Sequence, residues 1–169
     1  MNYENWAVLA AVLSISPCWA AQGLVTERTI SLDAAEDAAR VALETCRKAG
    51  QKVTVTVLDQ AGRTKVILRD DGASPHSVQH SMNKAYTALT FDQPSSQFGK
   101  RATSNPTGAG SLHLDKIATA GGGLPIRVGH EVVGSIGVSG SRGTISAAGG
   151  SNDAKCGQAG IDQVAKMFQ

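Results

Sequence analysis

The first clear pattern of hydrophobic and polar positions in the chain has the period of an α-helix. Between Leu32 and Ala49 apolar residues recur at steps of three and four, which predicts an amphipathic helix. Ser31 precedes this segment as an N-cap, acidic residues stand in its first turn, basic residues in its last, and Gly50 follows. The predicted buried stripe is rich in alanine, which suits close packing: Leu32, Ala35, Ala39, Ala42, Cys46 and Ala49.

The period then changes to two residues. Val53, Val55 and Val57 alternate with threonines, which predicts a strand with one buried face. Turn-forming residues occupy positions 59–62, and Thr64–Arg69 has the pattern of a second strand. The two segments therefore predict a β-hairpin.

The next predicted helix carries two histidines one turn apart. Ser74 is a suitable N-cap and Pro75 suits the first helical position, so we expect the helix to run from Pro75 to about Thr90. Its predicted buried stripe consists of Val78, Met82, Ala85 and Leu89. The opposite face holds the residues with most chemistry: His76, His80, Asn83, Lys84 and Thr87. That face is compatible with a solvated surface, a subunit contact or the wall of a ligand site.

The remainder of the chain alternates between helices and strands. A short helix follows Pro94, a loop covers residues 105–110, and a short strand is expected at Ile117–Ala120. A longer strand is expected at Glu131–Ser139 and a final helix at Asp153–Phe168. Because the strands are joined by hairpins and the helices are segregated, the sequence predicts an α+β layer fold with an antiparallel sheet of about five strands.

Residues 1–21 have the pattern of a secretory signal peptide. Trp6–Ile15 is apolar but too short to span a bilayer, and Pro17 breaks it just before a small-residue end. The segment before it contains Glu4 and no Lys or Arg, which leaves a buried N-terminal helix as the alternative. Cleavage would leave residues 22–169 as a single periplasmic or secreted domain with no stable membrane insertion.

The composition argues against nucleic-acid and nucleotide partners. The formal charge is only +2 and the basic residues are scattered, without the basic patch that a nucleic-acid surface needs. The glycine run at 121–123 is followed by Pro125 and another strand, so no helix N-terminus is available to hold a phosphate. Aromatic residues are 4% and there are 19 glycines, which predicts an aliphatic core with close backbone contacts.

Two cysteines remain after the predicted cleavage, Cys46 and Cys156. An exported chain permits a disulfide between them, because disulfides persist in oxidising compartments. The alternative is two small buried residues on separate helices.

Six short motifs follow one another from Asp59 to the last helix: Asp59-Gln-Ala-Gly62, Asp71-Gly72-Ala73, Lys84-Ala-Tyr-Thr-Ala88, Gly121-Gly-Gly-Leu-Pro-Ile126, Val133-Gly-Ser-Ile-Gly-Val-Ser-Gly140 and Cys156-Gly-Gln-Ala-Gly-Ile161. In this order they resemble the GlcG/HbpS family, which includes the C-terminal domain of PduO-type proteins. The resemblance extends from Ser31 to the end of the chain. It implies a profilin-like fold, a homo-oligomer and haem binding, with export in some members. Other members are linked to iron binding, redox sensing or haem breakdown.

A haem site needs an axial donor, apolar walls and partners for the propionates. His76 is the best candidate donor, because the positive end of its helix favours the neutral imidazole. Arg69 and Lys84 are candidate propionate partners, and Tyr86 and Met82 are candidate apolar contacts. His76 is also compatible with a merely exposed helix end.

The same helix offers a metal site without haem. His76 and His80 stand at i, i+4 and could share a divalent ion such as iron, although no His-Glu-x-x-His pattern is present. His113 and His130 lie in predicted loops and are expected at the surface.

Enzyme signatures are missing from the sequence, so no catalytic residue is assigned. The chain has no Gly-x-Ser-x-Gly elbow, no Cys-x-x-Cys and no recognisable triad. Asp70 and Asp71 could serve as an acid–base pair or could simply shape the turn before the helix.

Three functions therefore stay open. The preferred one is an exported haem-binding protein that sequesters, delivers or senses haem. The second is an enzyme or accessory protein that acts on a small molecule in an oxidation pathway. The third is a metal or redox sensor.

Overall fold

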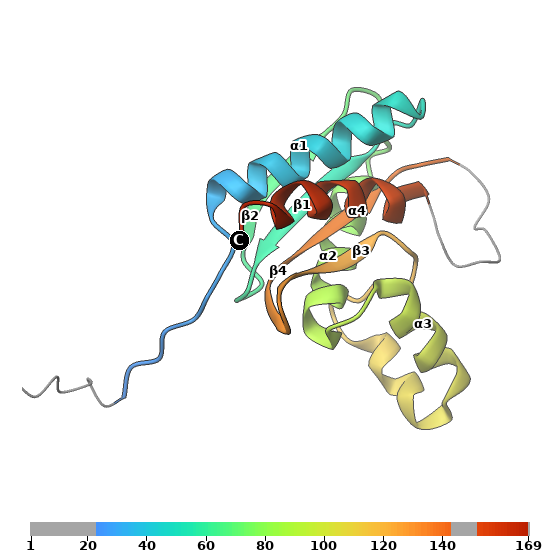
Figure 1. The fold of residues 1–169 in the computed structure, drawn as a ribbon. Helices are drawn as coiled ribbons and strands as arrows, with labels where there is room; N and C mark the ends of the chain where they lie inside the picture. The colour runs from blue at the N-terminus through green and yellow to red at the C-terminus, as the bar shows by residue number, and fades with distance from the viewer. Residues whose placement is uncertain (1–22, 143–151, 169) are drawn as a thin grey trace, which may run out of the picture.

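The computed structural model describes residues 23–142 and 152–168, which form one antiparallel sheet with helices on both faces (Figure 1). The predicted signal peptide lies outside these residues. The strand order is β2-β1-β4-β3. In chain order the elements are α1 (Leu32–Lys48), β1 (Thr54–Asp59), β2 (Thr64–Arg69), α2 (Ser77–Phe91), α3 (Ser95–Ser104), the 3-10 helix η1 (Pro106–His113), β3 (Gly123–Val128), β4 (Glu131–Ser139) and α4 (Asn152–Ala165).

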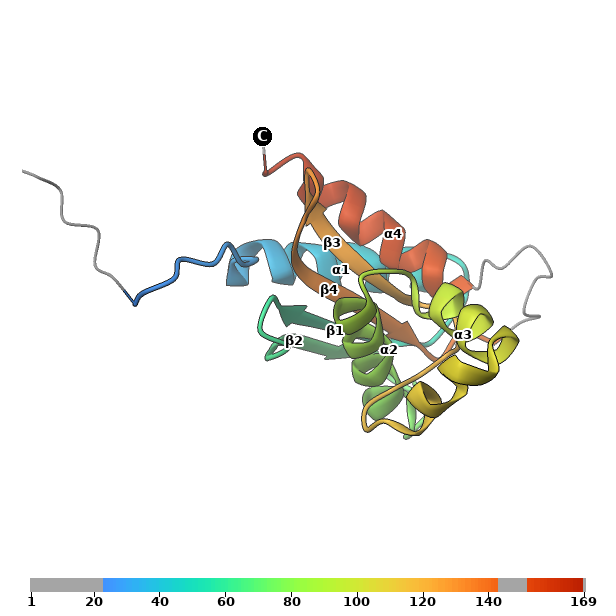
Figure 2. The ribbon, with the colours of Figure 1, turned by 90° about the horizontal axis from the view of Figure 1, so that it is seen from below.

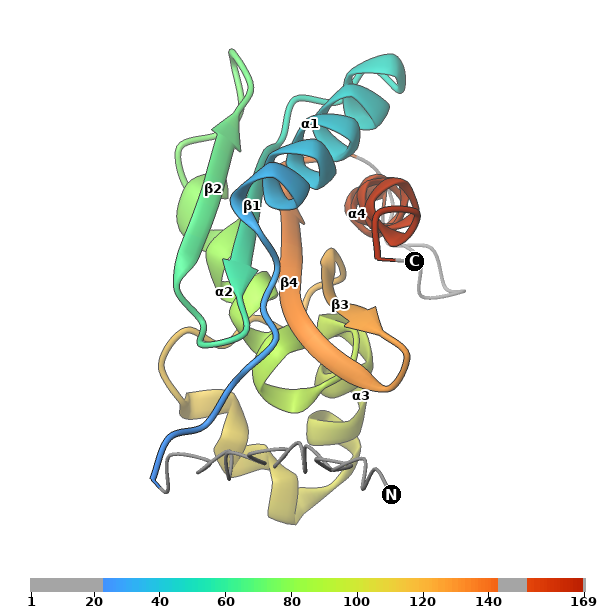
Figure 3. The ribbon, with the colours of Figure 1, turned by 60° about the vertical axis from the view of Figure 1, so that its left-hand side comes forward.

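The sheet separates two helical layers (Figure 2). Helices α1 and α4 cover one face, where the aliphatic core lies, and α2 covers the other. Helix α3 and η1 extend beyond α2, away from the sheet. Strands β2 and β3 form the two edges, with β1 and β4 between them (Figure 3). The predicted α+β class with an antiparallel sheet is confirmed, while the profilin-like comparison stays a prediction.

Helix α1 forms as its sequence predicts. The Ser31 hydroxyl accepts a hydrogen bond from the Ala34 N–H at 3.2 Å, and Gly50 ends the helix with a φ of +71°. Its alanine stripe lets α4 approach so closely that a Cβ on Gly160 would lie 2.4 Å from the Ala38 carbonyl oxygen. The predicted stripe is correct except at its ends, because Leu32 and Ala49 are exposed.

A disulfide joins these two helices. Cys46 on α1 and Cys156 on α4 are bonded, with their Cα atoms 5.5 Å apart. Both cysteines are buried within the core. The proposed pairing is therefore confirmed, and the covalent link fixes α4 against α1.

Strand β1 is buried on both faces, so the prediction of one buried face was wrong. Its valines face the aliphatic core, and its threonines face α2 rather than solvent. Thr54 is hydrogen-bonded to Ser77 and Thr56 to Ser81, each at 2.7 Å between hydroxyl oxygens. The threonines can be buried because their hydroxyls are hydrogen-bonded to serines of α2. The strand therefore keeps its alternation of valine and threonine although both faces are buried.

Helix α2 presents a different face to the sheet from the predicted one. Of the predicted stripe only Ala85 is buried, whereas Val78, Met82 and Leu89 are half-buried. The buried residues are instead small or polar: Ser77, Ser81, Lys84, Ala85, Thr87 and Ala88. The sheet accepts this face because β4 and β3 lack side chains where the helix crosses them. A Cβ on Gly137 would lie 2.0 Å from the Ser81 carbonyl oxygen.

Two further predictions about local structure were wrong. Helix α2 begins at Ser77, with His76 at its N-cap position, rather than at Pro75 after a Ser74 cap. Ile117–Ala120 is not a strand, because the Ala118 N–H donates to the Thr87 hydroxyl of α2 at 2.8 Å instead of joining the sheet. The sheet of the described residues therefore has four strands rather than about five.

Among the helices within residues 23–142 and 152–168, none is long and apolar enough to cross a bilayer.

Candidate functional site

The two histidines of α2 lie side by side at the start of the helix. Their ring centroids are 6.3 Å apart, with 41° between the ring planes. His76 is exposed, and its side chain makes no capping hydrogen bond. His80 is half-buried, with its Nδ1 atom 3.1 Å from the hydroxyl oxygen of Ser139 on β4. One imidazole is therefore held in place while the other is accessible.

Burial keeps His80 neutral near pH 7. Desolvation lowers the pKa of His80 below its usual value, and the positive charges of Lys84 and His76 lower it further, against an opposing effect of Asp153. A neutral imidazole is the form that ligates metals. His80 thus has the protonation state that a ligand requires.

Lys84 is buried in an ion pair rather than displayed on an open face. Its ammonium donates to a carboxylate oxygen of Asp153 at 2.8 Å and to the Val138 carbonyl oxygen at 3.0 Å. The lysine side chain is 3% exposed and that of Asp153 is 8% exposed. The prediction that Lys84 lies off the core face was wrong. Its charge is bound within the protein and joins α2, β4 and α4.

Met82 and Tyr86 lie on the opposite flank of α2 from the histidines. At 3.6 residues per turn, positions 82 and 86 are separated from 76 and 80 by roughly a quarter to nearly half of the helix circumference. The structure therefore does not bring the predicted apolar contacts beside the predicted donor.

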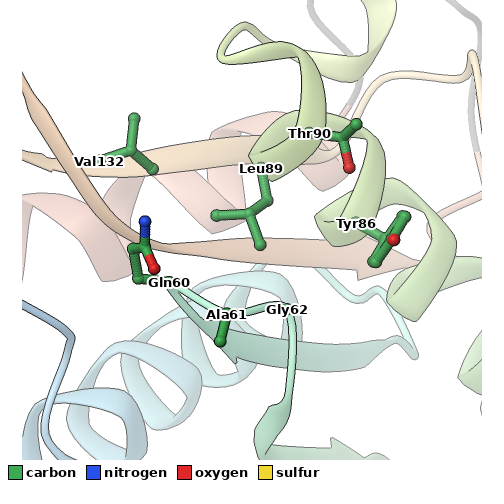
Figure 4. Close-up of a pocket in the computed structure, with 7 residues that line it drawn as sticks. All are labelled: Gln60, Ala61, Gly62, Tyr86, Leu89, Thr90 and Val132. Atoms are coloured by element: carbon green, nitrogen blue, oxygen red, sulfur yellow. The ribbon is translucent and has the colours of Figure 1, made fainter. Parts of the chain in front are cut away.

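Tyr86 instead lines a pocket of about 280 Å³ (Figure 4). The close-up shows it beside Leu89 and Thr90 of α2, above the turn between β1 and β2. The Lys116 ammonium lies 5.3 Å from the centre of the Tyr86 ring. The lining residues include hydrogen-bonding and apolar groups but no charged side chain: Gln60, Ala61, Gly62, Tyr86, Leu89, Thr90 and Val132.

Arg69 lies at the same end of the molecule as His76. Its guanidinium donates to the Ala73 carbonyl oxygen at 2.6 Å, three residues before His76 in the chain. The residue is exposed, at the end of edge strand β2. It is thus a cation near the beginning of α2.

Asp70 is a structural anchor. Its carboxylate accepts a hydrogen bond from Arg47 of α1 at 2.9 Å, and its side chain is only 2% exposed. The hydrogen bond from Arg47 holds the pKa of Asp70 below its usual value. A carboxylate kept charged in this way is a poor proton donor and a weak base. The geometry therefore favours the turn-shaping interpretation of Asp70 over acid–base work.

The remaining histidines and acidic groups add no further cluster. His113 and His130 are exposed, as predicted. Among the described residues no group of three or more His, Cys, Asp or Glu side chains is arranged to hold a metal ion. The contact that sequence reasoning missed is His80–Ser139, because it depends on which face of α2 meets the sheet.

Residues 30–162 match the model of a protein family described as "Haem degrading protein HbpS-like". The chain belongs to the HbpS-like family. The resemblance seen in the six sequence motifs is therefore confirmed.

The chain is also similar to individual proteins and solved structures. An uncharacterised 15.0 kDa protein from the dhaT-dhaS intergenic region of Citrobacter freundii is 32% identical over 114 residues, which are 66% of this chain and 80% of that protein. A double mutant of Streptomyces reticuli HbpS is 34% identical with a TM-score of 0.75, covering 88% of this chain and 97% of that chain. The crystal structure of a PduOC:haem complex shares the fold, with a TM-score of 0.67 and 23% identity over 79% of this chain and 94% of that chain.

Proposed function

We propose that this HbpS-like protein is an exported haem-binding protein that sequesters, delivers or senses haem, with His76 as the axial donor. The observation that carries the proposal is the accessible imidazole of His76 at the start of α2, in a family described by its action on haem. Haem iron already has four porphyrin nitrogens, so a protein need supply only one or two axial donors. His76 alone can therefore supply the donor that haem needs.

The side chains around His76 fit part of a haem site. Arg69 lies at the same end of the molecule and supplies a cation for a propionate. Lys84 is left out of this set, because its ammonium is already bound by Asp153. Bound haem would supply iron chemistry at the open axial position.

A haem site also needs apolar walls, and the described part of a single chain does not place apolar side chains beside His76. The accessible neighbours of His76 on its flank of α2 are His80 and Asn83, which are polar, whereas Thr87 on the same predicted face is buried. We therefore place haem against this flank with a second copy of the chain closing the pocket, as a homo-oligomer would allow.

Export is supported by the disulfide. A buried bond between Cys46 and Cys156 is expected in an oxidising compartment, and residues 1–21 have the pattern of a signal peptide. A periplasmic or secreted location accounts for both features.

Haem titration of the untagged protein, followed by absorbance, tests the proposal. We expect saturable binding of one haem per chain with a sharp Soret band, and a shifted band with at least ten-fold weaker binding in His76→Ala. His113→Ala is the matched control, because His113 is an exposed histidine on η1 far along the chain. Equal spectra and affinities for the wild-type protein and His76→Ala would refute His76 as the donor, and unsaturable binding would refute the haem role.

A second candidate function is the binding of a small organic molecule in the Tyr86 pocket. The observation in its favour is the combination of Gln60, Tyr86 and Thr90 with apolar walls and no charged lining residue. Ligand-observed NMR against a library of uncharged fragments tests it. Binding that is lost in Ala61→Leu, which would add bulk to the lining of the pocket, would support this function; a library without hits would reject it.

A further inference from the structure

The paired histidines of α2 have the geometry of a site for a bare metal ion. Side chains at i and i+4 lie on one face of a helix, about 5–6 Å apart at Cβ. The rings of His76 and His80 follow this rule, with centroids 6.3 Å apart. Both imidazoles can thus reach one ion without any change in the backbone.

Only a small adjustment separates the observed rings from chelation. An ion bound at about 2.0–2.1 Å from a ring nitrogen lies roughly 3.2 Å from the ring centre, so two rings at about 90–110° have centroids about 4.5–5.2 Å apart. The observed separation of 6.3 Å is therefore greater by about 1.1–1.8 Å. A side-chain rotation of His76 supplies this movement, because His76 is exposed.

The other imidazole is already oriented. Ser139 is 2% exposed, and its hydroxyl lies 3.1 Å from Nδ1 of His80. When Nδ1 carries the proton and donates to this hydroxyl, the lone pair of Nε2 is left for a metal. A hydrogen bond of this kind behind a ligating histidine fixes its tautomer and raises metal affinity.

The positive charge of Lys84 opposes a cation at His80 only in part. The nearest positive group on α2 is Lys84, and it is neutralised by Asp153 at 2.8 Å. The described residues offer no third His, Cys, Asp or Glu ligand at this point, so the other positions belong to water. Two imidazoles with water ligands suit a divalent ion late in the transition series, with Cu²⁺ the tightest and Zn²⁺ and Ni²⁺ weaker.

We propose that His76 and His80 chelate one divalent transition-metal ion, with Ser139 orienting His80. The site exists in the haem-free protein and does not require the haem role. It shares His76 with the proposed haem site, so an ion bound there and haem exclude each other. That second statement rests on the proposed function.

Calorimetric titration of the untagged, haem-free protein with Cu²⁺ tests the metal site. We expect one site per chain, with binding at least ten-fold weaker in His76→Gln and in His80→Gln. A His113→Gln/His130→Gln double variant removes two exposed histidines elsewhere and should bind within two-fold of the wild-type protein. Electron paramagnetic resonance of the copper complex should show two coupled imidazole nitrogens, falling to one in either single variant.

The proposal is overturned if both single variants bind Cu²⁺ as tightly as the wild-type protein, or if the control variant loses binding equally. Ser139→Ala keeps both imidazoles, and a weakening of about ten-fold is expected from loss of the orienting bond. An unchanged affinity there would remove Ser139 from the site. Circular dichroism of each variant confirms that it is folded.

Haem titration of the same variants separates this proposal from the haem role. Loss of copper binding in both variants with unchanged haem binding would leave the metal site standing and reject His76 as the haem donor. Loss of haem binding in His76→Gln with copper affinity unchanged in both variants would support His76 as the haem donor and reject the metal site.

Discussion

Removing the charge of Lys84 should destabilise the fold strongly while leaving the haem surface intact. The substitution Lys84→Met keeps an unbranched chain of similar length, removes the ammonium and replaces one methylene by sulfur. It leaves the carboxylate of Asp153 buried, with its side chain 8% exposed. Among the described residues, the Ser141 N–H still donates to this carboxylate at 3.0 Å.

The expected magnitude follows from the burial of both partners. Breaking a buried ion pair by removing one partner costs about 3–5 kcal/mol, because the remaining charge is uncompensated. For a domain of this size about 1 kcal/mol corresponds to about 3 °C, so the melting temperature should fall by about 9–15 °C. Lys100→Met is the matched control: Lys100 is exposed on α3, and its loss should change the free energy of unfolding by less than about 0.5 kcal/mol.

Urea unfolding of a double-mutant cycle with Asp153→Asn provides the assay. The double variant buries no unpaired charge, so it should recover a large part of the stability that Lys84→Met loses, with a coupling energy of about 2 kcal/mol or more. Additive losses, or a loss below about 1 kcal/mol in Lys84→Met, would refute the buried pair. Haem affinity of folded Lys84→Met should stay within two-fold of the wild-type protein, and a large drop would return Lys84 to the propionate site.

Three other predictions concern the parts of the fold that hold the site. Replacing Cys46 and Cys156 together by Ala should lower the free energy of unfolding by about 3–5 kcal/mol, because the bond closes a loop of 110 residues, and non-reducing urea unfolding measures the change. Gly137→Ala should cost at least about 2 kcal/mol in the same assay, since the new Cβ would lie 2.0 Å from a carbonyl oxygen of α2. Arg47 lowers the pKa of Asp70, so the stability that Asp70 contributes is present above its unfolded pKa and is lost as the pH falls through its folded pKa. Asp70→Asn should therefore flatten the loss of stability below about pH 4, and parallel pH profiles would contradict this.

The sequence was sufficient for elements whose signals are local. The N-cap at Ser31, the alanine stripe and Gly50 defined α1, and alternating valines defined β1. The disulfide also agreed with the sequence, because Cys46 lies on the helix face that the periodicity predicts to be buried and an exported chain permits the bond. In each case the local pattern and the tertiary packing favour the same arrangement.

The sequence was insufficient where a polar residue is buried by a specific partner. The pattern predicts that Thr56 is solvated, but in the structure it is buried against Ser81. It likewise predicts that Lys84 is exposed, but Lys84 is buried in an ion pair with Asp153. Partners such as Lys84 and Asp153 are 69 residues apart in the chain, so periodicity carries no signal for them. The hydrophobic pattern alone therefore assigns Thr56 and Lys84 to the surface.

The burial of small and polar residues of α2 also decides where its two histidines lie. The predicted stripe of α2 was centred near Met82, whereas the observed buried face is centred near Ser77 and Ala88, which is roughly a quarter of a turn away. On the predicted face, His80 would point away from the sheet and have no partner. With the observed face on the sheet, His80 lies against β4, where it contacts Ser139, while His76 is exposed one turn earlier. The small and polar residues that let α2 lie directly on the sheet are thus also what turns two surface histidines into one fixed and one free imidazole. The haem and metal proposals both depend on this arrangement.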